Sequence, residues 1–230
     1  MIGLEAEADV EHSSSETASE DTALARFILD LRSKGITDPA LLNAFESVPR
    51  GAFIGGFRPG LLYSPISLPI ACGEEATDPF TLARHLLHLE LRPGLRVLEI
   101  GTGSGYLSAV MARLGVEVTS YERYRSLIRH AEQALRGAGI TQVAPLLGDG
   151  LARPDLPQGF DRIIVNGALE AVPGHLTDRL NVNGIALAHR RRGLETRLTL
   201  WRKDLTGYAA SEDRGPSRMG LMRAGLPAIL

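Results

Sequence analysis

The chain has 230 residues, of which 44% are hydrophobic and 23% charged, and its formal charge at pH 7 is −2. This length and apolar fraction suffice for one sizeable core, so we expect a single globular unit. The small net charge gives no electrostatic reason to expect a nucleic-acid partner, which usually requires a strongly basic face. No run approaches the ~18–20 apolar residues of a membrane-spanning helix. Residues 1–9 also lack the basic start and apolar run of a secretory signal, so we expect no membrane partner and a cytoplasmic location.

The cysteine and histidine content argues against a disulfide or a metal centre. Cys72 is the single cysteine, which excludes an internal disulfide and a multi-thiolate site. The six histidines show no spacing such as H-E-x-x-H that would bind zinc. We therefore expect no metal, a reducing compartment, and a packing role for Cys72.

The amino-terminal part of the chain begins with a polar stretch and continues with helices. Residues 1–21 are acidic and rich in Ser and Thr, and they contain too few large apolar residues to offset the entropy of ordering, so we predict a flexible tail. From residue 22 apolar residues recur at helical spacing until Gly35. Asp38 is placed to cap a second short helix, which closes before Pro49.

The rest of the chain is typical of an α/β protein. Residues 61–79 hold four prolines or glycines between short apolar runs, which favours an ordered, loop-rich segment. A helix is expected from about Pro79, and β-branched runs then alternate with helical ones, which predicts a doubly wound, mostly parallel sheet covered on both faces. Two more strands joined by residues 189–194 suggest an antiparallel edge. The predicted strands are 97–100, 116–121, 143–147, 163–165, 185–188 and 196–201, and the predicted helices are 106–113, 126–136 and 174–180.

The strongest local signal is the segment 97–106, in which a buried strand runs into a glycine turn that opens a helix. Glycines let the backbone approach a ligand at the carboxyl end of the sheet, where open α/β folds place their sites. A dinucleotide fingerprint would need Gly or Ala where bulky Tyr106 stands, and the Gly-Lys-Ser/Thr of a phosphate-binding loop is absent. These two departures disfavour a dinucleotide and a nucleoside triphosphate as the ligand. The turn itself comprises Glu99, Gly101, Thr102, Gly103, Gly105 and Tyr106.

Two acidic residues farther along complete a pattern that suits S-adenosylmethionine. Glu122 closes the second strand about twenty residues after the turn, where a carboxylate can accept hydrogen bonds from two ribose hydroxyls. Asp149, next to Gly150, is placed after the third strand to accept from an adenine amine. Together with Glu99 these acids suit a ligand that carries an ammonium and a sulfonium. Alone, the glycine turn is equally compatible with a dinucleotide or with tight packing, and each acid alone is an ordinary surface or turn residue.

Several segments, in order along the chain, make it similar to the protein-L-isoaspartate O-methyltransferase family. Residues 31–38 and 48–54 resemble the amino-terminal signature of that family. Residues 68–70 and 73–79 resemble its active-site loop. The resemblance continues through 99–106, 148–150, 160–165 and 172–173, and therefore covers nearly the whole chain after the tail.

The resemblance implies a class I S-adenosylmethionine-dependent, Rossmann-like fold with an amino-terminal helical cap, in which residues 22–80 carry the helices and active-site loop and 81–230 the cofactor-binding core. It implies methyl transfer to the free carboxylate of L-isoaspartyl residues in damaged proteins or peptides, with S-adenosylhomocysteine as product and a monomer by default. Thr77 takes the place of the family's substrate-contacting serine and is the expected catalytic residue. Phe80 and the turn, Glu122, Asp149 and Gly150 are expected to bind the cofactor; Ile70, Ala76 and Asp78 are expected in the substrate loop, within a candidate lid at 63–78.

The active-site loop departs from the family pattern through Glu74, Glu75 and Asp78, which replace uncharged residues. A carboxylate ~6 Å from a carboxylate substrate would cost about 3 kcal/mol at an effective dielectric of ~20 unless it is paired or points to solvent. Arg84 and the run 189–192 are candidates to compensate this charge, although a charge run is usually a solvated face. Two alternatives therefore stay open: another peptide or small-molecule acceptor on the same scaffold, and a non-catalytic S-adenosylmethionine-binding module. A nicotinamide dehydrogenase is the weakest alternative.

Overall fold

The protein is described by a computed structural model that covers residues 20–152, 156–207, 209–223 and 225–227. Most of the predicted tail lies outside these residues. Glu20 and Asp21 are exceptions, because they already belong to the first helix, which runs over residues 20–33. The tail prediction is wrong for these two positions, since the Glu20 carboxylate accepts hydrogen bonds from Gly51 N (2.9 Å) and from the Tyr63 hydroxyl (3.1 Å).

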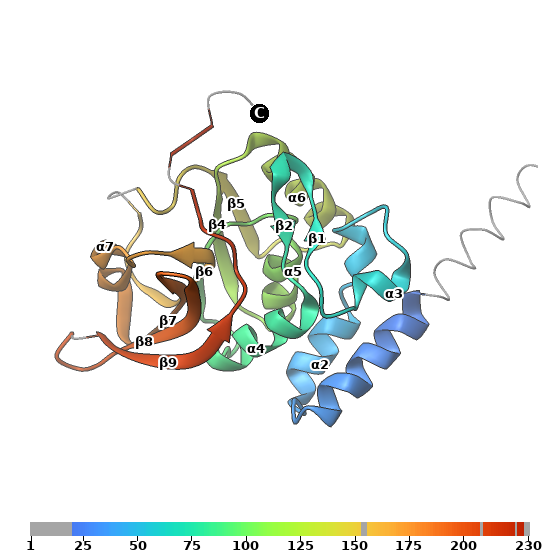
Figure 1. Ribbon diagram of the computed structural model, residues 1–230, viewed down its shortest axis with the longest axis horizontal. Coiled ribbons are helices and arrows are strands. Elements are labelled where there is room, and N and C mark those ends of the chain that lie inside the picture. Colours follow the sequence, from blue (N-terminus) through green and yellow to red (C-terminus); the bar gives the residue numbers. More distant parts are fainter. Residues whose placement is uncertain (1–19, 153–155, 208, 224, 228–230) are drawn as a thin grey trace, which may run out of the picture.

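The centre of the molecule is a seven-stranded sheet, which confirms the predicted mostly parallel α/β fold (Figure 1). Its spatial order is β5-β4-β3-β6-β7-β8-β9. The first five strands in this order pair in parallel, and β8 and β9 pair antiparallel at the far edge. The strands are β3 (Arg96–Ile100), β4 (Glu117–Glu122), β5 (Val143–Leu147), β6 (Phe160–Leu169), β7 (Leu180–Arg192), β8 (Glu195–Lys203) and β9 (Ala209–Ser217).

Helices cover both faces of the sheet because side chains alternate along each buried strand. In β3, Val97 packs into one hydrophobic cluster and Leu98 into the other. The first cluster extends from Phe27 in the first helix to Leu200 in β8, so residues 22–80 share a core with the sheet. The helices are α2 (Pro39–Glu46), α3 (Pro59–Leu62), α4 (Pro79–Leu89), α5 (Tyr106–Arg113), α6 (Arg125–Gly137) and α7 (Gly174–Asp178), with short 3-10 turns η1 (Arg50–Ala52) and η2 (Ala71–Gly73).

The segment 61–79 contains more regular structure than its composition predicts. Its first residues complete α3, and two short strands, β1 (Leu68–Pro69) and β2 (Glu75–Ala76), pair as an antiparallel hairpin. Each strand is only two residues long, so no alternating pattern can form in the sequence. The hairpin holds the predicted active-site loop as an ordered element beside the sheet (Figure 1).

The antiparallel edge is larger than predicted. The expected link 189–194 is mostly strand, because β7 continues to Arg192 and pairs with β8 down to Arg192–Glu195. β9 was not predicted, since its residues are mainly polar and exposed. At the opposite edge β5 is only half-buried, whereas a fully buried strand was expected. In the part of the chain that the structure describes, no helix is long and apolar enough to cross a membrane.

Candidate active site

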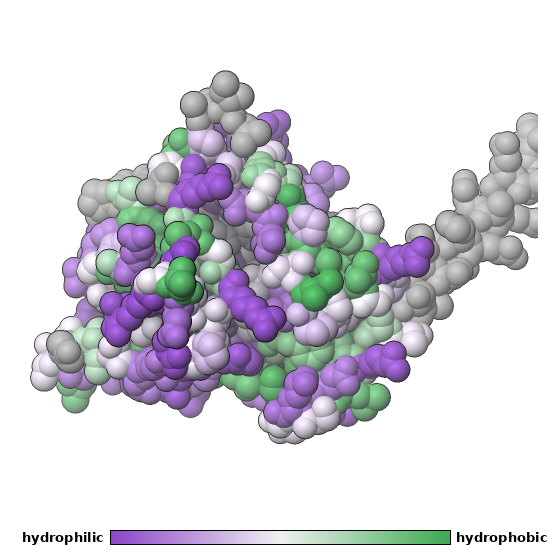
Figure 2. Space-filling view, in the orientation of Figure 1, coloured by the Kyte–Doolittle hydropathy of each residue, from purple (hydrophilic) through white to green (hydrophobic). Residues whose placement is uncertain are grey.

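A cavity of about 730 Å³ lies at the carboxyl ends of β3, β4 and β6. This is the edge at which parallel sheets place ligands, because the connecting loops diverge there. The β1–β2 hairpin and the segment that follows β9 contribute further walls, and Figure 1 shows both running along the same side of the sheet. On the face drawn in Figure 2, hydrophilic and hydrophobic residues are interspersed over these elements.

Glu122 and the glycine turn form one wall of this cavity. The Gly103 amide donates to Glu122 Oε2 and the Tyr124 amide to Glu122 Oε1, both at 3.0 Å. Gly101 and Gly103 have φ angles of 92° and 54°, a region that favours glycine, so a residue with a Cβ would strain the turn. Burial and then the charge of Glu74 raise the pKa of the Glu122 carboxyl, while the backbone amides lower it. The structure thus holds a buried carboxylate against the turn at the cavity wall, and its predicted contact with the ribose hydroxyls stays a prediction.

Glu99 does not line the cavity, and its predicted contact with the ligand stays a prediction. The side chain is fully buried, and its carboxylate accepts from Ser108 Oγ, from Ser120 Oγ at 2.7 Å and from Asn166 Nδ2 at 2.8 Å. Burial raises the pKa of this carboxyl to about 7 despite these bonds. Asn166 also donates to the Gly101 carbonyl at 2.9 Å and lines the cavity, so Glu99 positions the turn through its neighbours.

Three other residues with predicted contacts do not line the cavity and have structural roles of their own. Gly105 has φ of 84°, and a Cβ there would lie 3.0 Å from the Ala131 Cβ, so the glycine serves close packing of α5 on α6. The Phe80 ring packs edge-on against Phe27 at 5.0 Å and anchors α4 to the first helix. Asp78 is the N-cap of α4, where its carboxylate accepts from the Thr81 amide at 2.9 Å.

The remaining predicted cofactor residues line the cavity: Thr102, Tyr106, Asp149 and Gly150. Asp149 accepts from the Leu151 amide at 2.9 Å through one oxygen and from the Gly225 amide through the other. The expected acceptor for an adenine amine is therefore already contacted by the carboxyl-terminal segment. A carboxylate oxygen has two lone pairs, so this contact leaves acceptor capacity free.

The hairpin brings Ile70, Ala76 and Thr77 to the cavity together with Glu74 and Glu75. Thr77 Oγ1 lies 3.7 Å from Met219 Sδ in the segment after β9. Residues 218–223 of that segment also line the cavity and were not predicted to do so. Their neighbour Gly167 has no side chain, and a Cβ there would lie 2.1 Å from Met222 Cγ, so the glycine lets the segment cross the sheet edge closely.

Arg50 is the most informative residue that the sequence did not single out. It lines the cavity although its side chain is fully buried, and its Nη2 donates to the Thr77 carbonyl at 2.7 Å. It lies within the segment 48–54, which resembles the family signature, but its burial could not be read from that segment. A charge next to Pro49 in an otherwise apolar stretch was the available signal.

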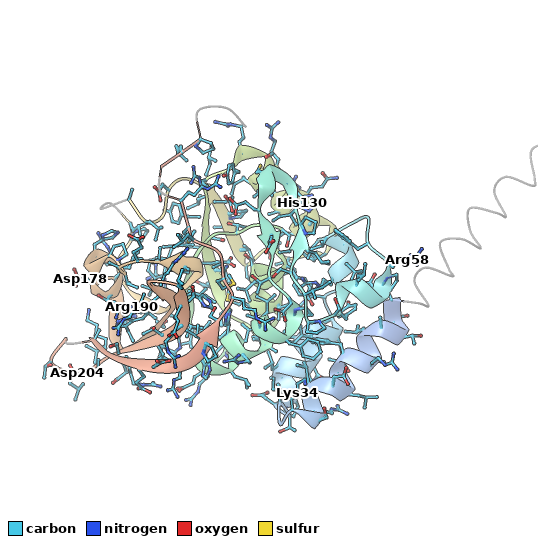
Figure 3. The ribbon with its side chains drawn as sticks, viewed as in Figure 1. Lys34, Arg58, His130, Asp178, Arg190 and Asp204 are labelled. Atoms are coloured by element: carbon cyan, nitrogen blue, oxygen red, sulfur yellow. The ribbon has the colours of Figure 1, made fainter. Side chains whose placement is uncertain are left out.

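The basic residues suggested as compensating charges do not reach the cavity. Arg84 is exposed and donates to the Arg214 carbonyl at 3.4 Å. The run 189–192 belongs to β7, and His189 is buried against Ser217. Arg190 lies among the strands at the left of Figure 3, away from the β1–β2 hairpin in that view. Cys72 Sγ lies 3.0 Å from Ser126 Oγ outside the cavity wall. Within the described ranges, no group of three or more His, Cys, Asp or Glu residues is arranged to hold a metal ion.

Comparison with known proteins identifies one family. The family model described as protein-L-isoaspartate(D-aspartate) O-methyltransferase matches residues 23–214. A relative named protein-L-isoaspartate O-methyltransferase 2 from Rhodopseudomonas palustris (strain HaA2) is 42% identical over 180 residues, which cover 77% of this chain and 83% of that protein. A relative of the same enzyme name from Ruegeria sp. (strain TM1040) is 39% identical over 160 residues, covering 70% and 74%.

Solved structures agree on the fold. A chain named protein-L-isoaspartate O-methyltransferase superposes with a TM-score of 0.79 at 25% identity, covering 88% of this chain and 67% of that one. A Plasmodium falciparum chain, solved in complex with S-adenosyl-L-homocysteine, superposes with a TM-score of 0.76 at 20% identity, covering 86% and 97%.

Proposed function

Because the chain belongs to the protein-L-isoaspartate(D-aspartate) O-methyltransferase family, we propose that it transfers a methyl group from S-adenosylmethionine to the free carboxylate of L-isoaspartyl residues in proteins and peptides. The observation that carries this proposal is that one cavity is lined by both halves of the required site. Glu122 and the glycine turn are suited to the donor, and the hairpin with Thr77 is suited to the acceptor.

The residues of the cavity fit S-adenosylmethionine. A volume of about 730 Å³ is within the ~300–1,000 Å³ range of small-ligand sites. The Glu122 oxygens accept the Gly103 and Tyr124 amides, and a carboxylate has about four lone-pair sites, so acceptor capacity is left for the ribose. The carboxylates of Glu74, Glu75 and Asp149 on the wall suit the ammonium and sulfonium of the donor, and the arginines on the same wall suit its carboxylate; these are Arg50, Arg123, Arg218 and Arg223.

The protein needs no general base for this reaction. A carboxyl group with a reference pKa near 4 is ionised at neutral pH. S-adenosylmethionine supplies an activated methyl group, and the products are a methyl ester and S-adenosylhomocysteine. What the chain must supply is alignment of the reactants and exclusion of water, effects that can together reach about 7–11 kcal/mol. In this proposal Thr77 Oγ1 holds one oxygen of the acceptor carboxylate, and the hairpin and residues 218–223 cover the site.

Repair follows from the chemistry of the product. An isoaspartyl methyl ester closes spontaneously to a succinimide, which reopens in part to normal aspartate. No second active site is needed, because methylation alone biases damaged chains towards restoration.

The altered loop supports a second candidate, in which the same scaffold methylates another peptide or small molecule. Asp78 is occupied as a helix cap, but Glu74 and Glu75 do line the cavity, where they would repel a carboxylate acceptor at short range. A non-catalytic S-adenosylmethionine-binding module would show the same cavity. A cytoplasmic location and a monomeric state also stay predictions. Light scattering after gel filtration tests the monomeric state.

The deciding experiment is transfer from methyl-labelled S-adenosylmethionine to a peptide that carries one isoaspartate, with the normal aspartyl peptide as control. Selective labelling of the isoaspartyl peptide supports the repair activity. Labelling of neither peptide by a protein that still binds S-adenosylhomocysteine would reject it. Labelling of a different acceptor would then favour the second candidate, and lack of turnover on any acceptor the binding module.

A further inference from the structure

The Arg50 guanidinium is placed where a charged side chain is rarely found. Arg50 begins η1 directly after Pro49, and its backbone amide donates to the Tyr63 hydroxyl at 3.1 Å. The side chain is 0% exposed, yet it forms part of the cavity wall beside Thr77 and Tyr106. The local fold therefore brings a buried cation to the expected acceptor side of the site.

This guanidinium is only partly paired. Nη2 donates to the Thr77 carbonyl at 2.7 Å, and the group lies 4.8 Å from the centroid of the Tyr106 ring. Nε and Nη1 are buried without a hydrogen-bond partner, and so is the Tyr106 hydroxyl. Asp78 is close enough to favour the charged form, but its carboxylate caps α4. Among the described residues no carboxylate forms an ion pair with Arg50.

A second buried arginine shows how this fold satisfies such a group when its role is structural. Arg162 is 9% exposed, and its three guanidinium nitrogens donate to the backbone carbonyls of Leu89, Asp161 and Glu90. Arg162 does not line the cavity. The comparison indicates that the unpaired donors of Arg50 are a property of the site and not of buried arginines in general.

Burying an arginine without a counter-charge is expensive, because its guanidinium stays protonated and loses its water. Desolvation lowers the pKa of Arg50, which is the electrostatic sign of this cost. A partner that enters the cavity with a negative charge and acceptor oxygens would remove it. A carboxylate has both, and guanidinium–carboxylate hydrogen bonds are among the strong ones.

We propose that Arg50 binds a carboxylate inside the cavity through the donors that the protein leaves unpaired. The inference rests on the proposed function, which brings two carboxylates to this cavity: that of the isoaspartyl acceptor and that of the amino-acid end of S-adenosylmethionine. Arg123 also lines the cavity with two unpaired donors, but it is only half-buried. Its guanidinium stacks on Tyr124, next to Glu122, the proposed acceptor for the ribose. Arg50 is the arginine whose guanidinium donates to the Thr77 carbonyl.

The test compares Arg50→Met with Arg162→Met, which removes a second buried guanidinium away from the site. Calorimetry measures the affinity for S-adenosylhomocysteine and for 5′-methylthioadenosine, which shares the thioether nucleoside but has no amino-acid carboxylate. Initial rates give KM and kcat for the isoaspartyl peptide. Thermal unfolding verifies that each variant is folded. Arg50→Lys, which keeps the charge with fewer donors, is measured in parallel and takes the place of Arg50→Met if that variant does not fold.

Each source of the carboxylate gives its own pattern. If Arg50 holds the acceptor, KM for the peptide rises by about ten- to a hundredfold in Arg50→Met while both nucleoside affinities stay unchanged. If it holds the cofactor end, the affinity for S-adenosylhomocysteine falls by about the same factor while that for methylthioadenosine is kept. In Arg50→Lys the affected quantity, either the KM for the peptide or the affinity for S-adenosylhomocysteine, is expected to worsen by about tenfold.

Three results would overturn the proposal: changes below twofold in every measurement, an equal loss of methylthioadenosine binding, or the same losses in Arg162→Met. A wild-type protein that binds S-adenosylhomocysteine but does not methylate the isoaspartyl peptide would instead reject the proposed function. In that event the affinities for S-adenosylhomocysteine and methylthioadenosine alone test Arg50. If the ratio of these two affinities in Arg50→Met equals that of the wild type, the carboxylate assignment is overturned.

Discussion

Replacing Glu122 by glutamine tests the donor half of the site most directly. Glu122 ends β4 and is 5% exposed, and its two oxygens accept the amides of Gly103 and Tyr124 at 3.0 Å. Glutamine has the same shape but only one acceptor oxygen. Its amide nitrogen would face one of these N–H donors, and only one oxygen would be left for the ribose hydroxyls.

The size of both effects follows from these contacts. One lost hydrogen bond to a charged acceptor is worth about 1.5–3 kcal/mol, so the affinity for S-adenosylhomocysteine should fall by about ten- to a hundredfold. An unsatisfied buried N–H costs about 1–3 kcal/mol of stability, or roughly 2–12 °C in Tm for a domain of this size. The stability loss should lie towards the lower end, because burial raises the pKa of the Glu122 carboxyl and removal of the charge relieves that cost.

Calorimetry with S-adenosylhomocysteine and thermal unfolding of the free protein measure the two effects separately. Glu117→Gln is the matched control, since Glu117 is an exposed glutamate at the start of the same strand. The assignment of Glu122 to the ribose would be refuted by an affinity within twofold of wild type in a folded variant.

Two further predictions concern the acceptor side and the antiparallel edge. Thr77→Val keeps the shape of the side chain and removes its hydroxyl, so kcat/KM for the isoaspartyl peptide should fall by about tenfold while cofactor affinity changes little; equal effects on both would make Thr77 merely structural. Burial lowers the pKa of His189 to about 4, below the unfolded value near 6.5. The stability that this histidine contributes is therefore complete above pH 6.5 and is lost as the pH falls to about 4. Thermal unfolding against pH should show a shallower acid loss in His189→Asn than in wild type, and identical slopes would contradict the assignment.

The sequence predicted most reliably those elements whose pattern and chemistry agree. The bounds of β5 and α5 coincide with the predicted 143–147 and 106–113, and the family and the mostly parallel fold are confirmed. Around the turn, a buried strand, glycines with positive φ and a helix start all require the same local geometry. Each local preference there supports the same structure, which is why the strand and the start of the helix could be predicted correctly.

The sequence was least informative where a residue's environment comes from distant segments. Glu99 looked like a ligand contact, but Ser108, Ser120 and Asn166 lie on three separate elements that enclose it. Phe80 offered no sign that its partner is Phe27, more than fifty residues earlier. β9 carries neither apolar alternation nor β-branched residues, since pairing at an exposed edge requires neither.

The acidic loop can now be interpreted residue by residue. Asp78 is explained by the cap of α4, and Glu75 is exposed at the cavity rim. Glu74 is different, because its charge contributes to the raised pKa of Glu122 and so acts on the donor side of the site. Two carboxylates that repel each other are both stabilised by a cation bound near them.

This placement predicts that Glu74 favours the charged donor over its neutral product. S-adenosylmethionine carries a sulfonium, whereas S-adenosylhomocysteine carries a thioether. Glu74→Gln should therefore weaken binding of S-adenosylmethionine, by up to about tenfold for a charge pair in a partly solvated cavity, and leave S-adenosylhomocysteine nearly unchanged. Calorimetry with both ligands measures the ratio, and Glu75→Gln is the matched neighbour. If the ratio of the two affinities is unchanged in Glu74→Gln, Glu74 does not act on the donor. Its charge would then act on the acceptor side, where it would repel a carboxylate substrate.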